Sequence, residues 1–308
     1  MEDGAILYLD GGLADRHKRG EGYIIFNQNV YDYEEMKVDN EKDMMGMIRQ
    51  LMGGIVKEMR ATKDHTRNEF LDVLIQADFT DAQIDALLLE IFGPGPDTSS
   101  CTIEWAMSKL IKSPNKLLKL HKELTSVIGQ SKEVREFDLE NLPYLHACIK
   151  EILRLHPPVT FLLPHRATMT CEVMNHTILK NSQILVNTYL IYRDPAVWEN
   201  SSIFKTERFL NSTVDYHGND FQYIPFGAGR RICPALNMAS RVTKFILASL
   251  FHNFEWSLPD GILPSELDMK NAFVLLVFAK TVPLVVNVMR KWMTLPISTL
   301  CNTYLIVS

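Results

Sequence analysis

The sequence predicts a mainly α-helical fold with small β sheets. Apolar residues recur at helical spacing through the first half of the chain, whereas short segments typical of strands appear only in the second half. The composition is that of a folded protein, since 46% of the 308 residues are hydrophobic and 22% are charged. This length fits one large domain or two smaller ones.

Charge and cysteine content exclude several functional classes. The chain has 37 acidic and 32 basic residues and a formal net charge of -5. No basic run is interleaved with aromatic residues, so we expect no nucleic-acid partner. The N-terminus is acidic where a signal peptide would be basic, and no apolar run reaches the ~18 residues of a membrane span, so we expect no membrane span in this chain. The cysteines fit neither a disulfide framework nor a zinc ribbon and favour a reducing compartment. They are Cys101, Cys148, Cys171, Cys233 and Cys301.

Helical patterns begin after a weakly patterned N-terminus. Residues 1–40 carry few signals, and we treat them as a poorly assigned N-terminal remnant. Apolar residues between Met44 and Met59 form one stripe at helical spacing, which predicts a helix. Thr80 and Gln83 form a capping-box pattern, which predicts the start of the next helix.

Prolines and glycines delimit the following helices. The two prolines of Gly93-Pro94-Gly95-Pro96 cost roughly 3 kcal/mol each in a regular helix interior, so the helix should break there and resume over residues 98–111. Ser113 as the cap, Pro114 at the first position and Gly129 as the stop predict another helix.

A further helix should begin near Asn141 and end before Pro157, because a residue that precedes proline is pushed out of the helical region. The elements predicted after it are a hairpin over residues 171–179 with a turn at Met174-Asn175, a helix over 235–254, a β pair formed by 273–278 and 282–288, and a C-terminal extension over 291–308 without an assigned function.

Glu151 and Arg154 lie three residues apart in the helix that ends before Pro157, so they share one face and can form an ion pair. At the surface such a pair contributes only a few tenths of a kcal/mol. The apolar neighbours leave little polar face around it, which favours burial. Removing one partner of a buried pair costs roughly 3–5 kcal/mol, because the other charge is stranded. We therefore predict a structural role for this pair.

A glycine-rich segment, Phe226 to Ala235, places Cys233 just before a predicted helix. A single cysteine is most often a small buried hydrophobe, and this interpretation applies to Cys101, Cys148 and Cys171. Cys233 differs, because helix N-terminal amides and two neighbouring arginines favour a thiolate, which is a ligand for soft metal centres. The segment lacks the third glycine and the strand-to-helix unit of a dinucleotide-binding fingerprint.

Four separate motifs follow one another along the chain, namely Gly95-Pro96-Asp97-Thr98, Glu151-x-x-Arg154, Thr206-Glu207-Arg208-Phe209 and Phe226-x-x-Gly229-x-Arg231-x-Cys233. They resemble, in order, the oxygen-activating stretch, the Glu-x-x-Arg pair, the Pro-Glu-Arg-Phe element and the cysteine-ligand signature of the cytochrome P450 family, the haem-thiolate monooxygenases. The resemblance spans roughly residues 68–290 and is to the C-terminal part of the family. Three short segments, 142–145, 154–158 and 193–195, are similar in sequence to plant microsomal members of the geraniol hydroxylase type. It implies an N-terminally truncated cytochrome P450 fold, with residues 41–290 as a haem-binding helical domain with small β sheets.

The resemblance also implies a haem b site. Cys233 matches the proximal ligand of the iron, bound as a thiolate. Phe226 and Gly229 belong to the loop around it, and Phe226 is expected to tune the iron. Arg231 and His165 match positions that hold the haem propionates through charge-assisted hydrogen bonds.

Further roles follow from the other motifs. Asp97 and Thr98 match residues that manage proton delivery during oxygen activation, where a hydroxyl in a locally opened helix can hold water. Arg208 matches the residue that completes a structural cluster with Glu151 and Arg154.

The implied activity is insertion of one oxygen atom into a small apolar substrate, with terpenoids as the candidate class. Electrons would come from NADPH through cytochrome P450 reductase. The implied location is the cytosolic face of the endoplasmic reticulum membrane, or the cytoplasm in the absence of an anchor.

Departures from the family pattern favour a second hypothesis. Pro94 stands where Ala or Gly is usual, and Pro96 stands where Thr is common, both over the expected oxygen pocket. The early helices and sheet of the family are also missing from the matched part. A truncated, catalytically impaired relative that binds at most haem or a partner is therefore the alternative. A third hypothesis, an unrelated helical scaffold with Cys233 in its core, leaves the order of the four motifs unexplained.

Overall fold

The structure, a computed structural model, describes residues 23–26, 29–32, 41–61, 70–130, 133–259, 261–274, 277–291 and 303–307. The chain divides into two compact units, Met1–Pro96 and Asp97–Ser308, and each unit has its own hydrophobic core. The predicted domain boundaries near residues 40 and 290 adjoin segments 33–40 and 292–302, which lie outside the described residues. That division stays a prediction.

The first unit combines a small hairpin with three helices. The hairpin pairs β1 (Tyr23–Phe26) with β2 (Asn29–Asp32) in antiparallel register. The helices are α2 (Glu41–Ala61), α3 (Phe70–Gln76) and α4 (Asp81–Phe92). Their buried side chains form a small core of Val56, Leu74, Ile84 and Leu88. The predicted helices after residues 44 and 80 are thereby confirmed.

Local capping fixes where α4 begins and ends. The Gln83 amide donates to Thr80 Oγ1 over 3.4 Å, and the Thr80 amide donates to Gln83 Oε1 over 2.9 Å, which confirms the predicted capping box. The helix ends at Phe92, and the amide of Gly93 donates to the Leu89 carbonyl over 3.0 Å.

The helix break at the prolines is confirmed, but the predicted restart at residue 98 is wrong. Helix α5 (Pro94–Ile111) resumes directly after Gly93. The first amides of any helix have no partner within it, so the prolines at 94 and 96 fit the first turn without loss of a hydrogen bond. The same residues that interrupt a helix interior therefore open a new helix here.

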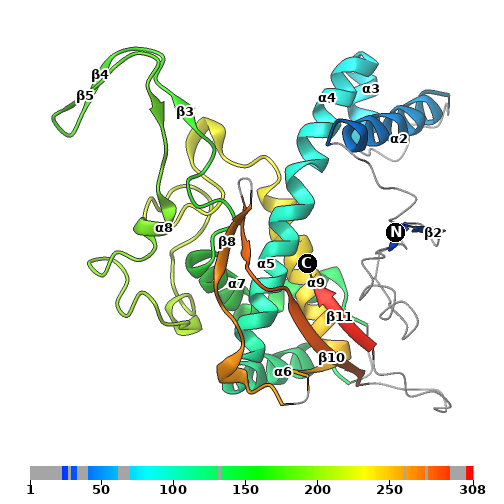
Figure 1. Cartoon of the computed structure of the whole chain (residues 1–308), viewed down its shortest axis with the longest axis vertical. Coiled ribbons are helices and arrows are strands. Elements are labelled where there is room, and N and C mark those ends of the chain that lie inside the picture. Colours follow the sequence, from blue (N-terminus) through cyan, green and yellow to red (C-terminus); the bar gives the residue numbers. More distant parts are fainter. Residues whose placement is uncertain are drawn as a thin grey trace. The chain divides into compact units, whose positions relative to one another are not determined.

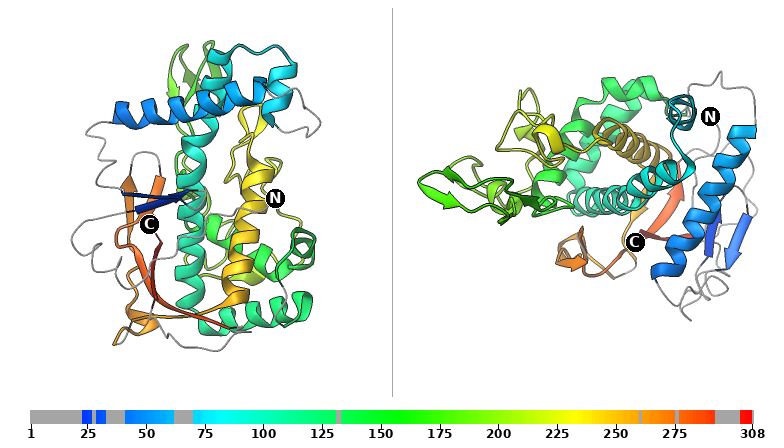
Figure 2. Two further views of the ribbon diagram at one scale, coloured as in Figure 1. Left: turned by 90° about the vertical axis from the view of Figure 1, so that its right-hand side faces the viewer. Right: turned by 90° about the horizontal axis from the view of Figure 1, so that it is seen from above.

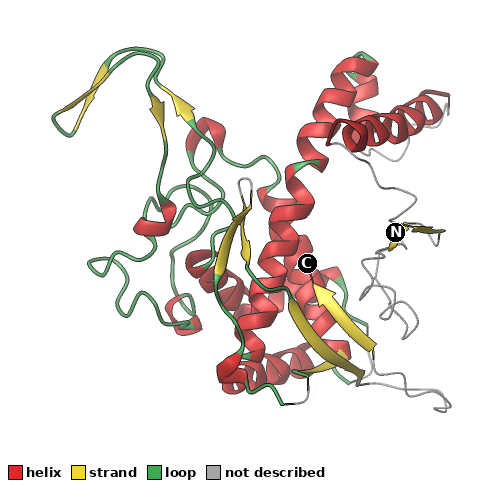
Figure 3. Ribbon diagram, in the orientation of Figure 1, coloured by secondary structure: helices red, strands yellow, loops and turns green. Residues whose placement is uncertain are grey.

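The second unit is built on four long helices around one core. Besides the main part of α5, these are α6 (Pro114–Ile128), α7 (Pro143–Leu155) and α9 (Leu236–Asn253). Figures 1 and 2 show α5 and α9 running alongside each other, with α6 across their ends. The largest fully buried side chains of this unit include Trp105, Met107, Leu120, Leu145 and Phe251. The helical core matches the predicted fold class, with strands at its margin (Figure 3).

The starts of α6 and α7 differ in their side-chain caps. Ser113 occupies the predicted cap of α6 with Pro114 after it, but its side chain makes no capping hydrogen bond. At the start of α7, Glu123 of α6 reaches the first turn, where its two oxygens accept from the amides of Tyr144 and Leu145 over 2.6 and 2.9 Å. This carboxylate satisfies two orphan amides and lies at the positive end of the helix dipole. Its own burial raises the pKa of Glu123.

Short elements connect these helices. They are η1 (Glu136–Asn141), α8 (Thr188–Ile191), η2 (Thr206–Arg208), η3 (Gly229–Arg231) and η4 (Pro264–Glu266).

Two small sheets precede α8. Strand β3 (His165–Arg166) pairs with β6 (Gln183–Ile184), and β4 (Cys171–Val173) pairs with β5 (His176–Ile178). The second pair confirms the predicted hairpin, because Met174 and Asn175 have the positive φ angles, 48° and 64°, that a two-residue turn of this kind needs. In Figure 1 this hairpin projects away from the helices of its unit.

The strands after α9 pair differently from the prediction. Strand β8 (Asn271–Val274) forms a hairpin with β9 (Val277–Lys280), whereas β10 (Leu284–Arg290) lies between β7 (Phe254–Ser257) and β11 (Thr303–Val307). The expected pair of 273–278 with 282–288 is wrong. Within the 291–308 extension, residues 292–302 and 308 lie outside the described residues, but 303–307 complete this sheet.

Candidate active site

Residues 226–233, named the Cys loop here, form a closed turn before α9. Two hydrogen bonds close it: the Gly227 amide donates to the Ile224 carbonyl over 2.9 Å, and the Cys233 amide donates to the Phe226 carbonyl over 2.8 Å. Gly227 and Gly229 have φ angles of 76° and 65°, in the region that favours glycine. The glycines therefore let the chain fold back so that Cys233 meets the start of α9.

Cys233 is half-buried, which sets it apart from the other described cysteines. Burial raises the pKa of Cys101 to about 12 and raises the pKa of Cys148 as well, so both thiols stay protonated near neutral pH. Cys171 is exposed on strand β4 of the projecting hairpin. Among the described residues, Cys233 is thus the thiol that combines a hydrogen-bonded loop, access to solvent and a helix N-terminus.

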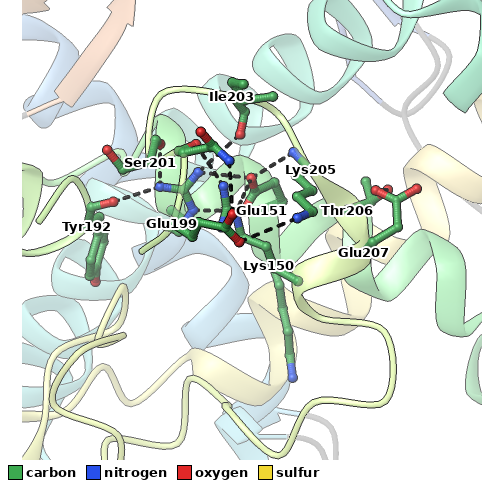
Figure 4. Close-up of polar contacts among 12 residues, drawn as sticks. Lys150, Glu151, Tyr192, Glu199, Ser201, Ile203, Lys205, Thr206 and Glu207 are labelled. Carbon is green, nitrogen blue, oxygen red and sulfur yellow. Dashed lines mark hydrogen bonds and ion pairs between the residues drawn. The ribbon is translucent and has the colours of Figure 1, made fainter. Parts of the chain in front are cut away.

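Glu151 and Arg154 form the buried pair that their apolar neighbours predicted, with both side chains 0% exposed. Arg154 Nε donates to Glu151 Oε2 over 2.7 Å, and Arg154 Nη2 donates to Glu151 Oε1 over 2.9 Å. This is a bidentate, charge-assisted pair. The guanidinium also donates to three backbone carbonyls, those of Tyr192 (2.6 Å), Ser201 (2.7 Å) and Ile203 (3.4 Å) (Figure 4).

Arg208 joins this pair from η2 and completes a charge cluster of Glu151, Arg154 and Arg208. Arg208 Nε lies 3.3 Å from Glu151 Oε1, and the same oxygen accepts from the Lys205 amide over 2.9 Å. Arg208 Nη2 donates to the Asn200 carbonyl over 2.7 Å. The fully buried carboxylate of Glu151 therefore fixes α7 to the segment 192–208.

Three more side chains hold the chain before the Cys loop, two by hydrogen bonds with α7 and one from the end of α8. Lys150 Nζ donates to the Val214 carbonyl over 2.9 Å, and Tyr223 Oη donates to the Lys150 carbonyl over 2.8 Å. Tyr192 Oη accepts from the Ile224 amide over 2.9 Å. Lys150, Tyr192 and Tyr223 were not predicted, because their partners lie 32 to 73 residues away and no local pattern marks them.

The other predicted site residues lie on separate elements. Asp97 and Thr98 are in the first turns of α5, where Asp97 is exposed and the Thr98 carbonyl accepts from the Thr102 hydroxyl over 2.8 Å. His165 is exposed on β3, and Arg231 is exposed at the end of η3. The structure thus brings Glu151, Arg154 and Arg208 together in the charge cluster. It also brings Phe226 and Cys233 together, in the Cys loop.

Comparisons with known proteins agree on one family. The family model described as Cytochrome P450 matches residues 21–281. Corytuberine synthase of Coptis japonica is 53% identical over 222 residues, which cover 72% of this chain and 46% of that protein. Geraniol 8-hydroxylase of Catharanthus roseus is 43% identical over 237 residues, which cover 74% of this chain and 48% of that protein.

A solved structure supports the same fold. A zebra fish cytochrome P450 with abiraterone superposes with a TM-score of 0.72 at 25% identity, covering 82% of this chain and 61% of that chain. This chain spans about half the length of the curated relatives it matches. Within the described residues, the helices are too short or too polar to cross a bilayer.

Proposed function

Because the chain belongs to the cytochrome P450 family, we propose that it holds the haem-thiolate centre of a monooxygenase. The reaction inserts one oxygen atom into a small apolar substrate. The observation that carries this proposal is Cys233, half-buried at the end of a loop closed by its own amide and placed at the start of α9.

The described residues fit a haem b group in their donor chemistry. An anionic sulfur ligand requires a thiol that ionises at low cost, and the buried Cys101 and Cys148 fail this requirement because burial raises their pKa values. When bound, haem supplies the redox chemistry that activates dioxygen. Cys233 would hold its iron, and the exposed Arg231 and His165 would hold its propionates by charge-assisted hydrogen bonds.

Asp97 and Thr98 are proposed to handle protons. Both stand in the opening turns of α5, where Asp97 is exposed and Thr98 is half-buried. An exposed carboxylate beside a hydroxyl can take up and pass on a proton. Electrons are proposed to come from NADPH through cytochrome P450 reductase, docking near the Cys233 face, on the cytosolic side of the endoplasmic reticulum membrane.

The names of the relatives narrow the substrates to be tried. Proteins 44% and 43% identical to this chain are named geraniol 8-hydroxylases, from Swertia mussotii and Catharanthus roseus. Others, 51% and 47% identical, carry names of (S)-N-methylcoclaurine 3'-hydroxylases. We therefore propose geraniol, a terpenoid, and (S)-N-methylcoclaurine as the first two substrates to test.

Turnover with purified reductase and NADPH tests the activity. We expect a hydroxylated product from one of the two substrates, and none from Cys233→Ser. Cys171→Ser is the matched control, since it alters an exposed thiol on the projecting hairpin, and it should retain full turnover. Stoichiometric haem without any product would contradict the monooxygenase proposal.

Pro94 and Pro96, in the first turn of α5 beside Asp97, favour the alternative of an impaired relative that binds haem without turnover. Pro94→Ala and Pro96→Thr restore the residue types that are usual in the family. Product formation by these variants but not by the parent chain would support the alternative. Equal turnover in all three proteins would exclude it.

A further inference from the structure

One tyrosine, Tyr216, contacts the chain on both sides of Cys233, at Phe226 in the Cys loop and at Ser240 on α9. Its side chain is 5% exposed and lies between α7, α9 and the loop. We infer that Tyr216 is a positioning residue that fixes the sulfur of Cys233 by holding the chain on either side of it. This inference rests on the proposed role of Cys233 as the haem ligand.

The first contact reaches the flank before Cys233. The ring of Tyr216 packs edge-on against the ring of Phe226, with centroids 5.4 Å apart and planes at 69°. This is a favourable geometry for an aromatic pair. The Phe226 carbonyl in turn accepts from the Cys233 amide over 2.8 Å. A displacement of the Phe226 backbone would therefore move the residue that carries the sulfur.

The second contact reaches the flank after Cys233. Tyr216 Oη lies 2.5 Å from Ser240 Oγ, on the second turn of α9. That helix begins three residues after Cys233, and the Leu236 amide donates to the Cys233 carbonyl over 3.3 Å. The hydroxyl therefore ties the segment before the loop to the helix that follows it.

Helix α7 holds the tyrosine in place from a third side. His146 Nε2 lies 3.1 Å from Tyr216 Oη, so the hydroxyl can donate to one neighbour and accept from the other. Lys150 Nζ lies 5.6 Å from the centre of the Tyr216 ring and 3.4 Å from Asp215 Oδ1. The Tyr216 amide donates to that same carboxylate oxygen over 2.7 Å. Backbone, ring and hydroxyl are each fixed by a different group.

Two substitutions separate the two contacts. Tyr216→Phe removes the hydroxyl and its links to Ser240 and His146, but it keeps the ring against Phe226. Tyr216→Leu removes the ring contact as well. Tyr144→Phe is the matched control: that hydroxyl is similarly buried and bonds to Thr206 over 3.3 Å, on the side of α7 that faces η2 rather than the Cys loop.

Hydrogen exchange of the whole chain without haem gives the first readout. The variant Tyr216→Phe loses two hydrogen bonds, and the loss of one accelerates exchange about five- to tenfold. We therefore expect the Gly227 and Cys233 amides to exchange at least that much faster in Tyr216→Phe, and faster still in Tyr216→Leu. Tyr144→Phe should leave both rates unchanged. Equal loop exchange in Tyr216→Phe and the parent chain, or equal acceleration by both phenylalanine variants, would overturn the inference. Tyr216→Phe keeps the test decisive if the leucine variant does not fold.

The reduced carbon-monoxide spectrum of the haem-loaded protein gives the second readout. We expect Tyr216→Phe to lose part of the thiolate band at unchanged total haem, whereas Tyr144→Phe keeps it. A parent chain that takes up no haem would refute the proposed function, while the exchange rates would still decide whether Tyr216 fixes the Cys loop. A full thiolate band in Tyr216→Phe together with unchanged exchange would refute the positioning role alone.

Discussion

Replacing Arg154 by methionine is the strongest perturbation of the charge cluster. Methionine fills similar space, but it removes every donor of the guanidinium. Glu151 would keep its charge at 0% exposure with only the Lys205 amide and Arg208 left as partners. Stranding one partner of a buried pair costs roughly 3–5 kcal/mol. The three carbonyls that Arg154 now satisfies would lose a donor as well.

A loss of about 4 kcal/mol corresponds to a fall of about 8–16 °C in the midpoint of thermal unfolding for a unit of this size. Urea unfolding at pH 7, with equal haem content in all samples, measures the free energy directly. Arg241→Met is the control, because Arg241 Nη1 also lies 2.8 Å from a carboxylate, that of Glu136, but the two side chains are 66% and 61% exposed. We expect that exposed pair to contribute less than about 1 kcal/mol.

The double variant Glu151→Gln/Arg154→Met separates charge from packing. Since it removes both charges, it should be less destabilised than the sum of the two single variants, by about 1–3 kcal/mol. An Arg154→Met variant no less stable than Arg241→Met would refute the reasoning. Strict additivity of the two single substitutions would refute the stranded charge as its cause.

Three other substitutions probe how the neighbouring elements are held. Glu123→Gln weakens the cap on α7 and should lower the free energy of unfolding in urea by roughly 1–2 kcal/mol. An unchanged urea midpoint would contradict the capping role. Gly218→Ala should lower the free energy of unfolding by roughly 1–3 kcal/mol more than Gly261→Ala does. Both glycines have a positive φ, but of the two only Gly218 would place the added Cβ 3.2 Å from the Cys-loop backbone. Equal losses of unfolding free energy in the two variants would argue against that close approach. His146 is neutral at pH 7, since burial and then the nearby lysines lower its pKa to about 4. The unfolded chain therefore binds more protons between pH 6.5 and 4, and about 2–3 kcal/mol of stability should be lost as the pH falls through that window. His146→Gln should lose less stability than the parent chain between pH 7 and 4.5. An identical loss in both proteins would contradict the assignment of this pH dependence to His146.

Elements set by residues within four positions of each other were predictable from the sequence. The Thr80–Gln83 capping box, the Met174-Asn175 turn and the break at Gly93 depend only on local backbone and side-chain preferences. The restart of α5 at Pro94 was not foreseen, because a proline that disrupts a helix interior also suits a first turn.

Local sequence patterns do not predict which of two distant strands pair with each other. The segments around β8 to β10 were expected to pair with each other, yet β10 pairs with β7, 30 residues earlier, and with β11 beyond the predicted domain. Alternation along a strand shows that it is a strand but not which neighbour it takes.

The residues of the candidate site also divide into those that local sequence patterns predict and those that they do not. Helical spacing predicted the Glu151–Arg154 pair, and the glycine-rich pattern marked Cys233. Arg208 was identified only through resemblance to a family. Tyr216 and Tyr192 carried no signal, because their partners lie on helices and loops tens of residues away.

The reduced carbon-monoxide spectrum of the purified, haem-loaded chain tests the central claim most directly. We predict stoichiometric haem with a thiolate-type band in the parent chain and in Cys171→Ser, and loss of that band in Cys233→Ser. A chain that binds no haem, or a Cys233→Ser variant that keeps the thiolate band, would contradict the assignment of Cys233 as the iron ligand.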